Sequence, residues 1–191
     1  PAPRPPIVAI ATIPPAQPSP SPRPSVGLFA MGALDLGTLP GVSPGVLLGV
    51  SALFGPLRAE LAAALFPAHD ATLAARPTAG GAVDLYAGSA AACWRFFAAR
   101  FELGPCLGLE VGRLRAQGFG VSDPSQGSAL WAAWRAGGAL GYRPVGPLIL
   151  GLRLEVAVPF ARPGFVLSNV GTVHRPSAAA GRALGGIEVR F

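Results

Sequence analysis

From Val26 to the end of the chain, apolar residues recur at every second position in segments that glycine and proline interrupt. A period of two residues is that of a β-strand, in which successive side chains point to opposite faces. The pattern predicts eight strands, at about residues 26–36, 45–54, 57–67, 81–95, 101–114, 128–142, 148–160 and 180–191. Each is near or above the roughly 9–11 residues that a tilted strand needs to cross membrane hydrocarbon. We therefore expect an all-β chain.

The chain is too apolar for an ordinary water-soluble surface. Only 13% of its residues are charged and its mean hydropathy is +0.48, whereas charged residues make up roughly a quarter of a typical soluble domain. Some apolar surface is therefore expected to face lipid. A transmembrane helix could only lie in the uncharged stretch 36–57, where Pro40, Pro44 and Pro56 would break it. Strands are the elements that we expect to cross the membrane.

The seventh predicted strand shows how its two faces differ. One face carries Arg153 and Glu155 among small residues, and the other is wholly apolar: Leu148, Leu150, Leu152, Leu154, Val156, Val158 and Phe160. In a membrane barrel the apolar row faces lipid and the charged row faces the lumen. In a soluble sandwich or a lipocalin-like ligand-binding barrel, the apolar row would instead face inward. Periodicity alone leaves these interpretations open.

The predicted connections alternate in length. Those after the second, fourth and sixth strands are short, at residues 55–56, about 96–100 and 143–147, and the others are longer, the longest at about 161–179. Membrane barrels have short periplasmic turns and longer outer loops, so an even number of strands leaves both termini on the periplasmic side. Aromatic residues, which form girdles at the membrane surfaces, lie near both predicted ends. Those near the periplasmic end are Phe54, Trp94, Phe96, Phe101, Tyr142 and Phe191, and those near the other rim are Phe66, Phe119, Phe160 and Phe165.

The closing segment, Gly185-Gly186-Ile187-Glu188-Val189-Arg190-Phe191, resembles the C-terminal assembly signal of bacterial outer-membrane barrels. The eight-strand layout is similar to that of small OmpA-type or OmpX-type barrels. The resemblance implies that residues 25–191 form a closed, antiparallel, up-and-down transmembrane β-barrel in the outer membrane of a Gram-negative-type bacterium. It also implies that the barrel assembly machinery recognises Ile187, Val189 and Phe191. The alternative is a chain that merely ends in an edge strand with phenylalanine.

Residues 1–24 are rich in proline, with Pro18, Pro20, Pro22 and Pro24 separated by single residues. Such a composition favours an extended, polyproline-like segment without a core of its own. We expect a disordered periplasmic tether that precedes the barrel. A partner that reads proline-rich segments is the less favoured alternative.

Alternation predicts that ten charged residues point into the lumen: Arg58, Glu60, Glu102, Glu110, Arg135, Arg153, Glu155, Arg182, Glu188 and Arg190. The interior of an eight-stranded barrel is just wide enough to be filled by side chains. We therefore expect a buried network of ion pairs that serves packing. A selective pore is the functional alternative.

Cys93 and Cys106 flank the second short turn and lie opposite each other if the hairpin is centred between Ala99 and Arg100. An oxidising periplasm favours a disulfide between them, and two buried free thiols are the alternative. Pointing both cysteines inward also turns Val83 and Leu85 inward and Tyr86 and Trp94 outward. A bulge in the fourth strand would avoid that arrangement.

Candidate catalytic groups occur only in the predicted outer loops: His69 with Asp70, His174, and Ser168 or Ser177. A hydrolase would need these side chains to converge in space, which the sequence does not indicate. The net charge of +6 comes from fifteen arginines without a lysine, and their scatter argues against nucleic-acid binding. We expect a monomeric structural or interaction protein in contact with outer-membrane lipid, with no enzymatic activity, metal or cofactor. A barrel-embedded hydrolase that uses His69 and His174 is the alternative.

Overall fold

The computed structural model of the chain describes residues 24–73, 76–120, 126–167 and 171–191. Apart from Pro24, the predicted tether of residues 1–24 lies outside this part. The strands are β1 (Ser25–Leu36), β2 (Val42–Phe54), β3 (Leu57–Leu73), β4 (Arg76–Trp94), β5 (Phe96–Ala98), β6 (Phe101–Phe119), β7 (Gln126–Tyr142), β8 (Leu148–Ala161), β9 (Phe165–Leu167), β10 (Gly171–His174) and β11 (Ala180–Arg190). No helix in the described ranges is long and apolar enough to span a membrane.

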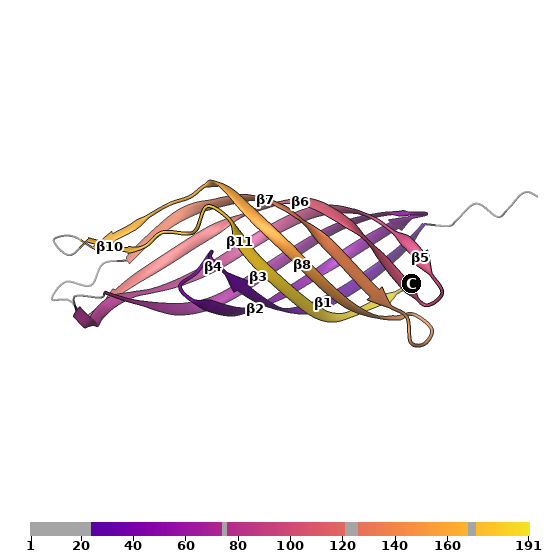
Figure 1. Ribbon diagram of the computed structural model, residues 1–191, viewed down its shortest axis with the longest axis horizontal. Coiled ribbons are helices and arrows are strands. Elements are labelled where there is room, and N and C mark those ends of the chain that lie inside the picture. The colour runs from indigo at the N-terminus through magenta and orange to yellow at the C-terminus, as the bar shows by residue number, and fades with distance from the viewer. Residues whose placement is uncertain (1–23, 74–75, 121–125, 168–170) are drawn as a thin grey trace, which may run out of the picture.

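Eight of these strands form one closed antiparallel barrel (Figure 1). Their order around the barrel is β4, β3, β2, β1, β11, β8, β7 and β6, and the pairing of β4 with β6 closes the ring. The short β5 continues β4 beyond Arg95 and also pairs with β6. A separate hairpin, β9 with β10, lies within the connection from β8 to β11. The predicted all-β, eight-stranded, up-and-down barrel is therefore confirmed.

The strands of the barrel are strongly staggered. Followed once around the barrel from Val26, the pairing register returns to β1 at Leu36, ten residues farther along (from 26 to 36). The successive partners are Ala52, Ala59, Ala92, Leu107, Ala136, Val156 and Gly181. A stagger of this kind requires strands tilted by roughly 35–45° from the barrel axis and leaves an interior that side chains can fill.

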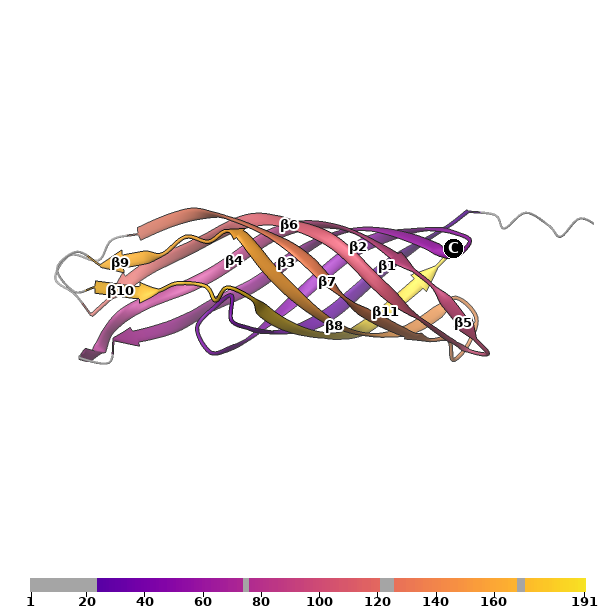
Figure 2. The ribbon, with the colours of Figure 1, turned by 45° about the horizontal axis from the view of Figure 1, so that its top comes forward.

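The two ends of the barrel differ. The backbone N–H of Phe191 donates to the carbonyl of Val26 at 2.8 Å, so the first and last strands meet at one end. We call this the short-turn end, because it also carries the connections 55–56, 99–100 and 143–147. Figures 1 and 2 show β9 and β10 projecting at the opposite end, which we call the hairpin end.

Strands at the hairpin end are longer than predicted. β3 and β4 reach Leu73 and Arg76, and β6 and β7 reach Phe119 and Gln126, so most of the expected loops at 68–80 and 115–127 is strand. The first expected long connection, 37–44, is shortened to 37–41 because β2 begins at Val42, and it is then no longer than the turn 143–147. The difference between the two ends therefore comes mainly from projecting strands. Sequence periodicity missed these extensions because their outward faces lack the regular apolar row that identifies the membrane-facing segments.

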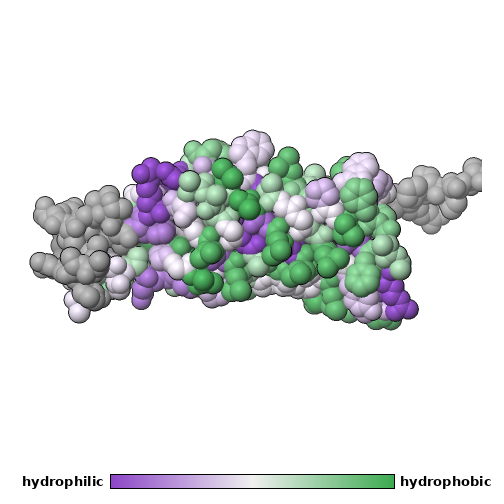
Figure 3. All heavy atoms as spheres, in the orientation of Figure 1, coloured by the Kyte–Doolittle hydropathy of each residue, from purple (hydrophilic) through white to green (hydrophobic). Residues whose placement is uncertain are grey.

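Large apolar side chains cover the outside of the barrel, and small or charged side chains occupy much of the inside. On β8, Leu154 and Phe160 are 62% and 61% exposed, whereas Arg153 and Glu155 are 4% and 7% exposed. Figure 3 shows apolar residues along the middle of the visible face. This arrangement is the reverse of a lipocalin-like barrel, whose large apolar side chains would line the interior.

The aromatic residues divide between the membrane-facing surface and the interior. At the short-turn end Phe54, Trp94, Phe96, Phe101 and Phe191 are exposed, and the ring of Tyr142 lies 5.0 Å from that of Phe101. At the hairpin end Phe160 is exposed, Phe119 is half-buried, and Phe165 packs against the core. Phe66 corrects the sequence prediction, because it points into the barrel and is 1% exposed.

Candidate functional site

The lumen holds a network of charged side chains that the barrel strands supply in register. All ten residues predicted to face inward do so, and the structure adds Asp35 on β1 and Arg95 between β4 and β5. We call these twelve residues the lumen network: Asp35, Arg58, Glu60, Arg95, Glu102, Glu110, Arg135, Arg153, Glu155, Arg182, Glu188 and Arg190.

Arg182 organises the part of the network that lies toward the hairpin end. Its Nε donates to Asp35 at 2.6 Å and its Nη1 donates to Glu110 at 2.5 Å. The indole N–H of Trp131 donates to the other oxygen of Glu110 at 2.7 Å. Glu110 is fully buried, so these donors replace the water that a carboxylate would otherwise need.

The middle of the network connects β3, β7 and β8. Nε of Arg135 donates to Glu155 at 2.9 Å, and Nη1 of Arg153 donates to Glu60 at 2.6 Å. Arg153 also lies 3.8 Å from Glu155, so the two pairs form a continuous chain of alternating charge. Glu60 in turn pairs with Arg58, two residues before it on the same strand.

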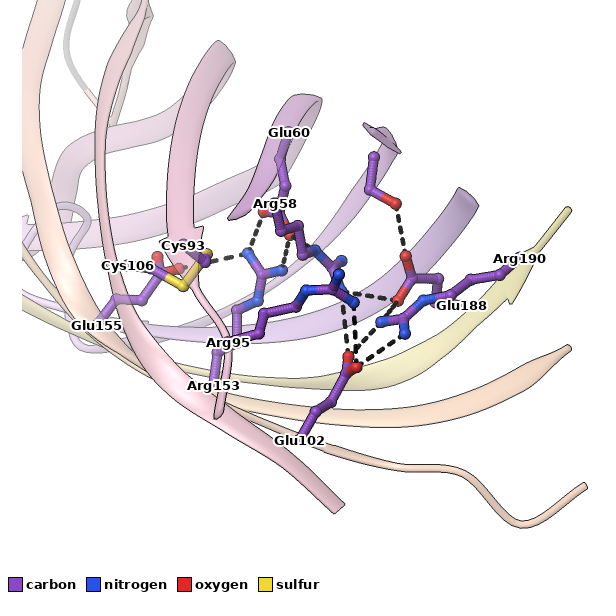
Figure 4. Close-up of polar contacts among 11 residues, drawn as sticks. Arg58, Glu60, Cys93, Arg95, Glu102, Cys106, Arg153, Glu155, Glu188 and Arg190 are labelled. Carbon is purple, nitrogen blue, oxygen red and sulfur yellow. Dashed lines mark hydrogen bonds and ion pairs between the residues drawn. A yellow bond between two sulfur atoms is a disulfide. The ribbon is translucent and has the colours of Figure 1, made fainter. Parts of the chain in front are cut away.

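The network continues to the short-turn end (Figure 4). Glu188 accepts from Nη1 of Arg58 at 2.8 Å, from Arg190 at 2.9 Å, and from the Ser51 hydroxyl at 2.5 Å. Arg190 also donates to Glu102 at 2.8 Å, and Glu102 lies 3.4 Å from Arg95. The last strand is therefore tied to β2, β3 and β6 across the interior.

The charges of the lumen network cancel. It contains six arginines and six acids, so the whole net charge of +6 is carried by residues outside it. Asp35 and Arg95 were missed because each lies at the end of a predicted strand. The alternation could nevertheless have predicted that both side chains point inward, since Asp35 lies on the same strand face as Met31 and Arg95 lies on the same face as Cys93.

An apolar plug lies beside the network, toward the hairpin end. Phe66, Leu85, Leu114 and Trp131 are fully buried there. Leu39 joins them from the connection 37–41, which turns inward and is fixed by a hydrogen bond from the Thr38 N–H to Asp35 at 2.9 Å. The guanidinium of Arg182 lies 5.0 Å from the Phe66 ring centre. Apolar and charged layers thus share one packed interior.

A small cavity lies at the short-turn end of the lumen. It has a volume of about 40 Å³ and lies among Arg58, Arg95, Glu102 and Glu188. A cavity needs roughly 10–15 Å³ to hold one water molecule. The cavity therefore has room for a few water molecules.

A disulfide joins Cys93 and Cys106 inside the barrel, as predicted. The two residues are direct register partners on β4 and β6, with Cα atoms 4.1 Å apart. β4 needs no bulge to place them, because Val83 and Leu85 do point inward, into the apolar plug. The register shift nearest to Val83 and Leu85 lies in β3 instead, between Phe66 and His69, and a second shift lies at the far end of the pair, between Thr72 and Leu73.

Those candidate catalytic groups at the hairpin end that the structure describes do not assemble into a catalytic set. Nδ1 of His69 lies 2.9 Å from the carbonyl of Pro67, and Nε2 of His174 lies 2.9 Å from the carbonyl of Thr38. Ser168 lies outside the described residues, and Ser177 makes a backbone hydrogen bond to Gly37. Within the described ranges, no hydrogen bond connects either histidine to a serine or a carboxylate.

The three residues of the resembled assembly signal share the outward face of the last strand. Ile187 and Phe191 are 50% and 71% exposed, and Val189 between them is half-buried. Backbone hydrogen bonds join Phe191 to Val26, so the side chain of Phe191 is free to contact lipid.

Comparison with solved structures finds the same architecture. A major outer membrane protein from Thermus thermophilus superposes with a TM-score of 0.58 at 14% identity, over 86% of this chain and 99% of that one. Neisserial surface protein A gives a TM-score of 0.52 at 14% identity, over 88% and 97% of the two chains. In fold, the chain is an outer-membrane-type β-barrel. The attachment invasion locus protein Ail of Yersinia pestis, bound to the heparin analogue sucrose octasulfate, gives the same values as the Neisserial protein. The chain matches no family model and none of the curated protein sequences.

Proposed function

We propose that this protein is a non-conducting outer-membrane barrel that anchors a projecting β-sheet at the cell surface for interaction with another molecule. The observation that supports the proposal is the content of the lumen, where a neutral set of twelve charged residues packs beside a layer of aromatic and aliphatic side chains. A filled interior leaves the exterior and the hairpin end as the places where the protein can meet a partner.

A selective pore is less well supported than a packed interior. A conducting pathway would have to pass the Arg182 pairs with Asp35 and Glu110, and then the buried ring of Trp131. Removing one partner from a buried ion pair typically costs about 3 to 5 kcal/mol. Opening such a path therefore requires breaking several costly contacts, which favours a structural role for the lumen network.

The hairpin end supplies the surface for interaction. β4 and β6 stay paired as far as Gly80 with Phe119, and β6 and β7 as far as Gln117 with Gln126. β10 contacts β3 and β4, so the β9–β10 hairpin lies against the projecting sheet. The similar Yersinia pestis protein is named for attachment and invasion, which supports a surface role for this architecture.

The orientation follows from the two ends of the barrel. The short-turn end would face the periplasm together with the tether of residues 1–24, and the hairpin end would face outward. Ile187, Val189 and Phe191 would be recognised by the barrel assembly machinery before the protein enters the lipid. Because the charged side chains of the lumen are already paired within one chain, we propose that a monomer suffices.

An epitope insertion on intact cells tests the proposed display. An epitope placed in the connection between β3 and β4 should bind antibody on intact cells, and one placed within 143–147 only after the outer membrane is permeabilised. Folding of both insertions is checked by the mobility shift on heating that closed barrels show in gel electrophoresis. Antibody binding to the 143–147 epitope on intact cells would show that the barrel has the opposite orientation and would contradict the proposal.

A further inference from the structure

The outward face of β3 and β4 is rich in small residues, because β4 carries three of them in succession and β3 alternates alanine with leucine. Its small residues are Ala59, Ala63, Gly88, Ala90 and Ala92, and the register sets Ala59 opposite Ala92 and Ala63 opposite Gly88. Leu61, which is 61% exposed, lies between these two levels and opposite Ala90, so the continuous row of small side chains follows β4. The outward face of β8 differs, because leucine, valine and phenylalanine follow each other there.

Larger side chains on the neighbouring strands border these small residues, so the surface between them forms a groove. β2 contributes Val46, Leu48 and Val50 on one side, and β6 contributes Leu107, Leu109 and Val111 on the other. Three adjoining hollows follow the groove, and the largest, about 720 Å³, lies toward the short-turn end. The groove is apolar along the membrane-facing part of the barrel.

Arg113 and Arg115 line the other end of the groove, toward the hairpin end, together with Tyr86. They follow Val111 on the outward face of β6 and are both exposed. The guanidinium of Arg115 lies 4.8 Å from the Tyr86 ring centre. Asp84 is the register partner of Arg115, but no ion pair links either arginine to a residue of the described ranges, so this end of the groove keeps an excess of positive charge.

We propose that the groove holds an acyl chain of a membrane lipid whose phosphate headgroup binds Arg113 and Arg115. A lipid is complementary to the groove, because it is apolar along its length and anionic at the end where the groove is positively charged. Arginine is well suited to phosphate, because its planar guanidinium can donate two parallel hydrogen bonds. Alternate residues of a strand share a face about two residue rises apart, so both guanidinium groups can reach one headgroup.

A second copy of the chain fits the groove less well. Two copies in one membrane have the same orientation, so Arg113 and Arg115 of both would lie at the same depth and repel each other. A lipid phosphate instead brings the opposite charge. The lipid proposal rests on the membrane location proposed above.

Native mass spectrometry of the full chain in detergent tests the proposal with two probes, dimyristoylphosphatidylglycerol and dimyristoylphosphatidylcholine. The wild-type barrel should retain the anionic lipid preferentially. Arg113→Gln with Arg115→Gln should lower that preference by about fivefold for each arginine. The matched control, Arg100→Gln with Arg143→Gln at the short-turn end, should leave it unchanged. Equal retention of the two lipids by the wild-type barrel would overturn the proposal.

Filling the groove provides an independent measurement. Ala63→Leu with Ala90→Leu should reduce retention of both lipids, whereas Ala183→Leu, on the outward face of β11, should not. Loss of a dimer in the groove variant, with lipid retention unchanged, would instead identify the occupant as a second copy. A barrel that shows the heat-dependent mobility shift but has no lipid preference would refute this inference and leave the proposed function intact.

Discussion

Arg182 on β11 and Glu110 on β6 meet across the lumen at 2.5 Å, although two other strands separate β11 from β6 around the wall. Glu110 is fully buried, and its other oxygen accepts from Trp131. The contact therefore joins distant strands through the interior, in addition to the hydrogen bonds along the wall.

Glu110→Gln should destabilise the barrel by about 3 to 5 kcal/mol, because it leaves the buried charge of Arg182 with Asp35 as its remaining ion-pair partner. The free energy of unfolding would be measured by urea titration in detergent micelles. Asp70→Asn, an exposed acid on β3, is the matched control and should change stability by less than about 0.5 kcal/mol. Equal stability of the two variants would mean that the lumen network is not the packed structure described.

Reduction of the Cys93–Cys106 disulfide should lower the free energy of unfolding by somewhat less than about 3 kcal/mol, because the bond closes a short loop with a sequence separation of 13. The barrel should stay closed, since β6 remains paired with β4 on one side of the bond and with β5 on the other. Cys93→Ser with Cys106→Ser should unfold at the same urea concentration as the reduced wild-type protein. A loss of strand signal in circular dichroism on reduction would contradict this expectation.

Arginine substitutions at two depths in the membrane test whether the apolar row of β8 faces lipid. Leu152→Arg, within the apolar belt, should cost about 2 to 4 kcal/mol, and Leu148→Arg, at the start of the strand, about 0 to 1 kcal/mol. The two variants would be compared by reversible unfolding in lipid vesicles. Equal costs at the two positions would argue against a lipid-facing row.

Phe191→Ala should reduce the amount of barrel assembled in the outer membrane of cells while leaving the stability of refolded protein within about 0.5 kcal/mol. The backbone hydrogen bonds between Phe191 and Val26 do not require the side chain. Phe54→Ala removes another exposed aromatic side chain from the short-turn end and is the matched control. The resemblance to an assembly signal is wrong if both variants reach the membrane in wild-type amounts.

The barrel was predictable from sequence wherever one face of a strand meets lipid and the other meets the lumen. On β8, for example, the alternation of Leu154 with Glu155 directly identifies the two faces. Phe66 was assigned to a rim because of its residue type, yet it has the same alternation as Arg58 and Glu60, which point inward. Its direction could therefore have been read from the strand.

Two parts of the structure carried no periodic signal. The projecting ends of β3, β4, β6 and β7 lack a continuous apolar row, so the pattern that reveals a membrane strand is absent there. The inward turn of 37–41 places Leu39 in a core cluster whose other members come from distant strands. Neither feature follows from a local pattern.

Conductance across a planar lipid bilayer tests the closed lumen most directly. The folded wild-type barrel, verified by its heat-dependent mobility shift, should insert without producing discrete current steps. Glu110→Gln should raise the frequency of current steps, because it weakens the packing that closes the lumen. Stable, repeated channel openings from the wild-type protein would contradict the account, because they would require a continuous water path through the lumen network.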